Sequence, residues 1–292
     1  MSTLKSIVSA VPHGTVVVGV DGSPGAARAL RWAAEEARDH HRPLTLVAAI
    51  VLPEKYRMGE AVMYYDEICT DVRAEAHRVL ADAREVAQGI APDVEVREVP
   101  AEADPRDVLI ELTKGAATVV VGSRGRGSMR SLLLGSTSVA VARHAHCPVV
   151  VCRPAPEDAT PRARVVVGVE GSERSVVTAE YAAALASYRQ LPLHVVHSRW
   201  LGPLGDTIPD QGIRLAETLA GLQEKYPDVE ITRENVDAAP EDRLVALSHE
   251  ATAVVVGAHA GGVASEILTG SVATAVVEHA RCPVVVVPHR EG

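Results

Sequence analysis

Short runs of apolar residues alternate with longer amphipathic stretches along the chain, a pattern typical of a parallel β-sheet covered by helices. In the first half, the apolar runs predict strands at 16–20, 44–51, 94–99, 118–121 and 148–152. The stretches between them predict helices at about 25–40, 61–88, 104–115 and 136–145. Residues 53–65 fit neither pattern, and we interpret them as a loop that covers a site.

The same order of elements recurs in the second half. Strands are predicted near 165–169, 193–197, 229–236, 253–256 and 284–287, and helices at about 173–189, 211–226, 240–250 and 271–280. Five strands and four crossovers in each half predict an α/β fold of two doubly wound, Rossmann-like parallel-sheet domains, given the usual right-handed connections.

Two pairs of similar segments indicate that the halves are copies of one domain-sized unit. The segment TVVVGVDGS, from Thr15 to Ser23, matches RVVVGVEGS, from Arg164 to Ser172, at seven of nine positions. Further on, residues 119–151 and 254–286 align without a gap, and both end in CPVVV. The sequence therefore predicts an N-terminal tail (1–14), a first domain (15–153), a linker (154–163) and a second domain (164–292).

Composition and charge narrow the range of functions. Apolar residues make up 47% of the chain and charged residues 23%, as in a globular protein. The net charge of −9 and the aromatic content of 3% disfavour nucleic acid or an anionic membrane as a partner. The sequence has no bilayer-length apolar run, no signal-peptide pattern and no CxxC pair among its four cysteines. We therefore expect a cytoplasmic protein.

A glycine-rich turn follows the strand predicted at 118–121, where an open α/β sheet places its ligands. It begins with Gly122 and Gly125, and Gly135-Ser136 then opens a predicted helix. Glycines let a ligand approach the backbone closely, and the first amides of a helix attract phosphate. Three arginines add positive charge to this loop, namely Arg124, Arg126 and Arg130.

The order Gly122-x2-Gly125-x9-Gly135-Ser136 resembles the Gly-2x-Gly-9x-Gly-Ser/Thr pattern of the ATP-binding universal stress proteins. The segments VGVDGS and HAHCPVVV also resemble that family, and the resemblance covers both halves. It implies ATP as the ligand, with or without Mg²⁺, and a role in regulating the response to stress or dormancy. It also implies that the halves pair about a pseudo-twofold axis through their terminal apolar runs, and that whole chains form homodimers.

Family roles can be carried over to individual positions of the first half. The resemblance assigns Asp21 to the adenosine portion of the nucleotide and the backbone of Ala49 to the adenine. It assigns the ribose and phosphates to Gly122, Gly125, Gly135, Ser136 and Thr137, with positive charge from Arg124 and Arg126. The alternative is structural: the glycines only make tight turns, and Asp21 caps the helix that follows it.

The second half departs from the motif. Glu170 stands in place of Asp21, and Ala260 in place of Gly125. The three loop arginines are replaced by His259, Gly261 and Ser265, and Glu266 adds a negative charge. Glu170, Gly257, Gly270 and Ser271 remain as weaker candidates. Because a triphosphate needs positive charge, we expect ATP mainly in the first domain.

Other chemistries find less support in the sequence. It lacks the GxxxxGK(S/T) loop of P-loop enzymes and the GxGxxG dinucleotide fingerprint. His144, His146 and Cys147 form no complete metal-ligand set. We interpret the histidines as residues near the C-terminus of a helix, where they interact with its carbonyls and dipole. No catalytic base is evident, so a dedicated enzyme is not expected. A slow ATPase or ATP-dependent transferase, and a nucleotide-free association scaffold, remain alternatives.

Overall fold

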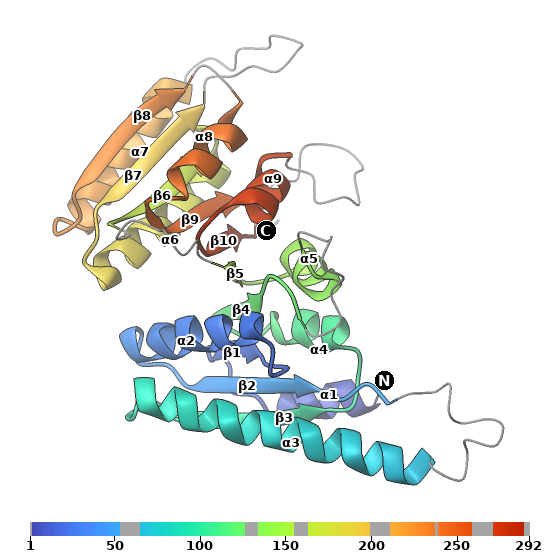
Figure 1. The fold of residues 1–292 in the computed structure, drawn as a ribbon. Helices are drawn as coiled ribbons and strands as arrows, with labels where there is room; N and C mark the ends of the chain where they lie inside the picture. Colours follow the sequence, from blue (N-terminus) through green and yellow to red (C-terminus); the bar gives the residue numbers. More distant parts are fainter. Residues whose placement is uncertain are drawn as a thin grey trace. The chain divides into compact units, whose positions relative to one another are not determined.

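The computed structural model describes residues 2–52, 65–125, 134–154, 163–198, 211–236, 239–258 and 271–288. The chain divides into two compact units, Met1–Cys152 and Arg153–Gly292, which we refer to as the first and second domains (Figure 1). Each contains five parallel strands with helices between them, and the two follow the same order of elements. The predicted tandem α/β architecture is confirmed.

The sheet of the first domain has the order β3-β2-β1-β4-β5, with every neighbouring pair parallel. The order reverses between β1 and β4. Its strands are β1 (Val16–Gly19), β2 (Leu44–Ala49), β3 (Val96–Ala101), β4 (Thr118–Gly122) and β5 (Val149–Cys152). Its helices are α1 (Ser2–Ser9), α2 (Pro24–Asp39), α3 (Tyr65–Ile90), α4 (Pro105–Leu112) and α5 (Ser136–His144).

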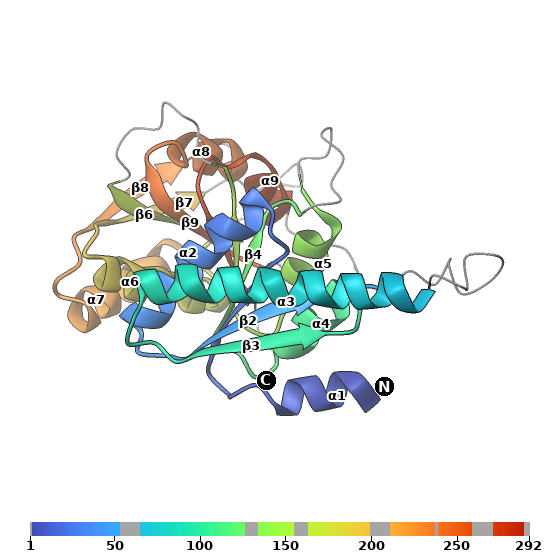
Figure 2. The same cartoon turned by 60° about the horizontal axis from the view of Figure 1, so that its bottom comes forward.

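Two pairs of helices cover this sheet. Helix α2 packs on β1 and β4, and the long α3 runs along β2 and β3 (Figure 2). Helices α4 and α5 pack against each other, with α4 also contacting β1 and β2. The central strands lie between these layers, so their valines are fully buried, as at Val17, Val120 and Val150. β-branched residues suit such strands because their side chains pack well on a pleated surface.

The second domain repeats the order, β8-β7-β6-β9-β10, again with parallel neighbours. Its strands are β6 (Arg164–Val169), β7 (Leu193–Ser198), β8 (Ile231–Val236), β9 (Ala251–Gly257) and β10 (Val284–Val287). Its helices are α6 (Glu173–Arg189), α7 (Gln211–Lys225), α8 (Pro240–Leu247) and α9 (Ser271–His279).

The N-terminal segment differs from the prediction. Residues 1–14 were expected to form a tail, whereas Ser2–Ser9 form helix α1, which packs against α4. The sequence carried a signal for it, since Leu4, Ile7 and Val8 recur at helical spacing and are half-buried. Most of the predicted loop at 53–65 and most of the predicted linker lie outside the described residues.

Candidate functional site

A cavity of about 650 Å³ lies in the first domain, at the carboxyl ends of β1, β2 and β4. The strand order reverses between β1 and β4, which is where open α/β sheets bind their ligands. Small-molecule sites are typically clefts of roughly 300–1,000 Å³. The lining residues are Gly19, Val20, Asp21, Ser23, Ala26, Val47, Ala49, Val51, Pro105, Leu109, Val121, Gly122, Arg124, Gly125, Gly135, Ser136, Thr137 and Ser138.

The cavity brings together the residues that the sequence singles out in the first domain. Eight of the nine candidates line it, namely Asp21, Ala49, Gly122, Arg124, Gly125, Gly135, Ser136 and Thr137. The ninth, Arg126, lies outside the described residues, as does Arg130. Residues separated by more than a hundred positions in the chain therefore converge on one space.

The carboxylate of Asp21 is held in place at the end of β1. Its Oδ1 accepts a hydrogen bond from the backbone N–H of Ser23 at 2.9 Å. Helix α2 is capped by Ser23, whose Oγ accepts from the N–H of Ala26 at 3.2 Å. The alternative in which Asp21 caps this helix is therefore wrong. Asp21 orders the turn before the helix and lines the cavity.

Helix α5 begins at the cavity without a side-chain cap. Its N-cap is Gly135, which has no side chain to bond to the first helical amides. Ser136, Thr137 and Ser138 follow and line the cavity. The positive end of the helix dipole and its first N–H groups therefore lie beside this space, an arrangement that suits an anion.

The ends of the glycine-rich loop are joined by hydrogen bonds. The N–H of Gly135 donates to the carbonyl of Ser123 at 2.7 Å, and the N–H of Ser123 donates to the carbonyl of Cys152 at 3.0 Å. The hydroxyl of Ser138 donates to the carbonyl of Gly135 at 2.8 Å. These bonds attach the start of α5 to the end of β4 and so give the cavity a defined wall.

The glycines of the site serve different purposes. Gly22 has a φ of +76°, which agrees with the interpretation that this glycine makes a tight turn. A Cβ on Gly122 would lie 2.5 Å from the carbonyl carbon of Gly25, so this glycine lets β4 and α2 approach closely. A Cβ on Gly135 would meet nothing closer than 3.5 Å, and its φ of −79° is open to any residue. Packing therefore accounts for Gly122 but not for Gly135.

Sequence reasoning did not find the apolar wall of the cavity. Val47, Pro105 and Leu109 line it, together with Val20 and Val51. Pro105 and Leu109 come from α4, which reaches the site because it crosses the sheet beside β1 and β2. The sequence signal that could have identified these residues is Asp104-Pro105, which marks the start of a crossover helix. This wall offers a flat ring an apolar surface.

In the second domain, the acid at the end of the first strand is Glu170, and its hydrogen bonds differ from those of Asp21. The hydroxyl of Ser172 donates to Oε1 of Glu170 at 2.8 Å, and the N–H of Glu170 donates to Oγ of Ser175 at 3.1 Å. Ser175 occupies the position of Ala26, a cavity-lining residue in the first domain. Gly257 ends β9, and Ser271 begins α9, while Gly270 lies outside the described residues. Glu170 is thus engaged by its own turn.

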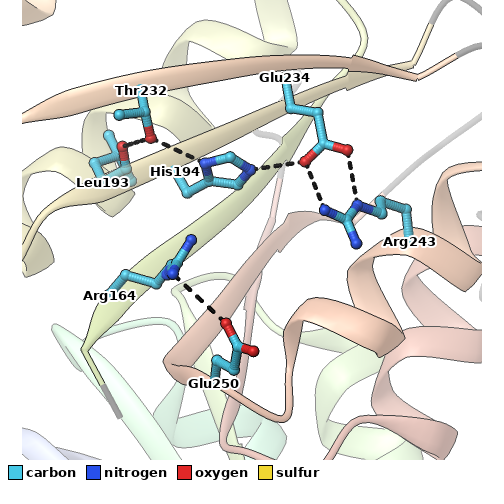
Figure 3. A network of polar contacts seen from close by, with 7 residues as sticks. All are labelled: Arg164, Leu193, His194, Thr232, Glu234, Arg243 and Glu250. Carbon is cyan, nitrogen blue, oxygen red and sulfur yellow. Dashed lines mark hydrogen bonds and ion pairs between the residues drawn. The ribbon is translucent and has the colours of Figure 1, made fainter.

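A charged cluster covers part of the second sheet (Figure 3). His194 bonds through Nδ1 to Oγ1 of Thr232 and through Nε2 to Oε2 of Glu234, both at 2.9 Å. Arg243 donates to both oxygens of Glu234, at 2.8 and 3.0 Å. The hydrogen bonds from Arg243 hold the pKa of Glu234 below its ordinary value against the effect of burial, and His194 adds to this lowering.

The matching positions of the first domain carry neither the histidine nor the acid. Thr45 stands in place of His194, and Val99 in place of Glu234. Oγ1 of Thr45 lies 2.9 Å from Oγ1 of Thr15, and both threonines are buried. The charged cluster joins β7, β8 and α8, and its groups are paired with one another. Its geometry therefore indicates a stabilising network.

Histidines and cysteines form no metal cluster in the part of the chain that the structure describes. His144 ends α5, the N–H of His146 donates to Oγ1 of Thr113 at 3.0 Å, and all four cysteines are buried and lie outside any disulfide. Among the described helices, none is both long and apolar enough to cross a membrane.

Comparison with known proteins identifies the family to which this chain belongs. The model of the universal stress protein family matches residues 13–153 and again residues 161–288. The chain therefore belongs to the universal stress protein family and carries its domain twice.

Relatives of similar length share this organisation. A universal stress protein of Mycolicibacterium smegmatis is 36% identical, covering 97% of this chain and all of the relative. One of Mycobacterium tuberculosis is 38% identical, covering 93% of this chain and 95% of the relative. The crystal structure of a universal stress protein from Archaeoglobus fulgidus matches with a TM-score of 0.68 at 20% identity, covering 94% of this chain and 98% of that one. That structural match shows the shared fold.

Proposed function

We propose that the first domain binds ATP in its cavity and that binding makes the protein a nucleotide-responsive regulator of stress or dormancy. The observation that carries this proposal is the placement of two polar features in one partly apolar space. Asp21 lies at the end of β1, and the uncapped start of α5 borders the same cavity. A nucleotide needs both, because it joins a sugar with hydroxyl donors to an anionic chain.

Each part of the cavity suits one part of the ligand. The apolar wall of Val47 and Leu109 suits adenine, near the backbone of Ala49. The carboxylate of Asp21 can accept hydrogen bonds from ribose hydroxyls. The amides at the start of α5 and the guanidinium of Arg124 suit the phosphates, since charge-assisted hydrogen bonds are the stronger kind. Mg²⁺ bound to the phosphates would neutralise part of their charge.

The second domain is proposed to bind nucleotide weakly or not at all. Ser172 already donates to the carboxylate of Glu170, and a ribose would have to compete with that bond. The sequence also replaces the loop arginines there, leaving less positive charge for phosphate. One ATP per chain is the proposed stoichiometry.

Regulation would follow from a change in association. ATP that favours one of two states of the protein would shift the population toward that state, and partners would distinguish the two. We propose that the protein acts in this way in the cytoplasm, as a homodimer. Light scattering of the purified chain with and without ATP tests the dimer. The pairing of the two halves through their terminal strands stays a prediction.

The decisive experiment is to identify the nucleotide that the protein carries. Purified protein is denatured, and the released small molecules are separated by chromatography and quantified against protein. We expect an adenine nucleotide at up to one per chain, or, if the protein is purified empty, saturable binding of added ATP. A chain that releases no nucleotide and binds no added ATP would refute the proposal.

A further inference from the structure

Two arginines of the first domain have buried donor atoms without a partner. The Nε of Arg28, on α2, and the Nε of Arg124, just after β4, are both buried and have no hydrogen-bond acceptor in the part of the chain that the structure describes. Arg124 lines the cavity, whereas Arg28 is not among the lining residues. A buried donor without an acceptor is unusual in a folded protein and calls for a partner, such as water, an ion or a ligand.

The backbone of Arg124 lies against helix α2, which carries Arg28, and the two charges are near enough to interact. Arg28 is three residues after Gly25 on the same face of α2, and a Cβ on Gly25 would lie 2.3 Å from the carbonyl oxygen of Arg124. Burial lowers the pKa of the Arg28 guanidinium, and the charge of Arg124 lowers it further. Two like charges are therefore held near one another, an arrangement that an anion between them would relieve.

Two groups in the described part of the chain, on α2 and β5, do not supply that anion. The carboxylate of Glu36, also on α2, accepts from Nε1 of Trp32 at 3.1 Å and from Oγ1 of Thr118 at 3.3 Å. The thiol of Cys152 lies near Arg28, but burial raises its pKa, so it stays neutral at physiological pH. Glu36 is thus occupied by its own hydrogen bonds, and Cys152 is uncharged.

The pair adjoins the end of the cavity that suits phosphate. A Cβ on Gly135, the N-cap of α5, would lie 3.5 Å from the Cα of Arg124. The backbone of Arg124 therefore lies beside both the start of α5 and the first turn of α2, the helix that carries Arg28. The planar guanidinium group presents several N–H donors that match the oxygens of a phosphate.

We propose that Arg28 and Arg124 together bind the terminal phosphate of the nucleotide, which makes Arg28 a phosphate-binding residue outside the glycine-rich loop. This inference rests on the proposed function of the cavity. It extends the site from the α5 terminus to helix α2, and it makes the site selective for a long phosphate chain. A nucleoside monophosphate would reach the amides of α5 without reaching Arg28.

The second domain lacks both members of the pair. Val177 occupies the position of Arg28 and is 51% exposed, and His259 stands in place of Arg124. Selectivity for a terminal phosphate is therefore assigned to the first domain alone.

The test compares ATP with AMP on the full-length chain by calorimetry. Arg28→Gln removes the charge, and Arg31→Gln serves as the matched control, because Arg31 is exposed on the same helix. We expect Arg28→Gln to weaken ATP binding about tenfold and to leave the AMP affinity within about twofold. Arg31→Gln should bind both ligands like wild type. Without ligand, Arg28→Gln should melt at or above the wild-type temperature, because it relieves the repulsion with Arg124.

The outcomes separate this inference from the function on which it rests. Wild-type protein that binds ATP, with Arg28→Gln binding it equally well, would overturn the inference and leave the proposed function standing. If Arg28→Gln lost ATP and AMP affinity equally, the inference would also be overturned. A melting temperature of Arg28→Gln well below wild type would overturn it too, because Arg28 would then be a structural residue. Wild-type protein that binds neither ligand would overturn both. Arg124→Gln provides a second variant and should show a similar loss for ATP.

Discussion

A Cβ atom on Gly125 would lie 2.6 Å from Oδ2 of Asp21, so the acid of the first strand and the glycine of the fourth-strand loop share one small space. Because Oδ1 of the same carboxylate is bonded to the N–H of Ser23, the side chain has little freedom to move away. Gly125→Ala should displace the carboxylate and weaken ATP binding about tenfold, or about 1.4 kcal/mol, as measured by calorimetry.

The control for Gly125→Ala is Gly89→Ala. Gly89 lies near the end of α3, and a Cβ there would meet no atom within 4 Å. Alanine at this position should leave ATP affinity unchanged and raise stability by up to about 1 kcal/mol, as is usual within a helix. A Gly125→Ala variant with wild-type affinity would show that the contact with Asp21 does not matter for binding.

Two glycines of the same motif should respond to alanine in opposite ways. Gly122→Ala places a methyl group 2.5 Å from the carbonyl carbon of Gly25, so β4 and α2 must separate. We expect a loss of roughly 1–3 kcal/mol in the free energy of unfolding. Gly135→Ala meets only ordinary contacts, so its melting temperature should stay near wild type while ATP binding falls. Thermal melts without nucleotide and calorimetry with ATP check both variants. Early melting of Gly135→Ala with intact binding would make Gly135 a folding residue.

The two acids that end β1 and β6 should differ in their effect on nucleotide binding. Asp21→Ala removes the acceptor that lines the cavity and should weaken ATP binding by tenfold or more, about 1.4 kcal/mol. Glu170→Ala removes a carboxylate already engaged by Ser172, so affinity and stoichiometry should match wild type. Calorimetry on the full chain measures both. Two equal sites, each lost with its own acid, would contradict the assignment to the first domain.

The cluster around His194 predicts a pH-dependent contribution to stability. The pKa of Glu234 is held below its ordinary value of 4.5, chiefly by Arg243. Its ionised form is therefore favoured by folding, and the stabilisation is present above that pH and lost as the pH falls through the lowered pKa. Glu234→Gln should destabilise the protein by about 1 kcal/mol near neutral pH, after allowance for solvent screening. Denaturant unfolding at several pH values should show this difference shrinking in acid.

Glu95→Gln is the control for Glu234→Gln. Glu95 pairs with Arg97 at 2.7 Å, but the side chains are 60% and 45% exposed. Exposed pairs of this kind contribute little, so the variant should unfold like wild type at every pH. If Glu234→Gln behaves in the same way, the network adds no stability.

Local patterns in the sequence were enough to predict the strands and to single out eight residues that line the candidate cavity. Apolar runs mark buried parallel strands, and glycine spacing after β4 led to Gly125 and Gly135 because both the motif and its place at a strand end are local. Pro105 and Leu109 were missed because they reach the cavity through the packing of helix α4. The contacts of His194 depend on strand register, which places it beside Thr232 and Glu234.

The duplication has a consequence for how this protein can change over generations. In an assembly of identical chains, every mutation appears in both copies of a site, so a change that spoils one spoils the other. Here Asp21 and Glu170 are encoded by separate codons. Selection can therefore preserve one site while the other drifts or acquires a new task, and the sequence already records that divergence in the loop arginines that only the first copy has.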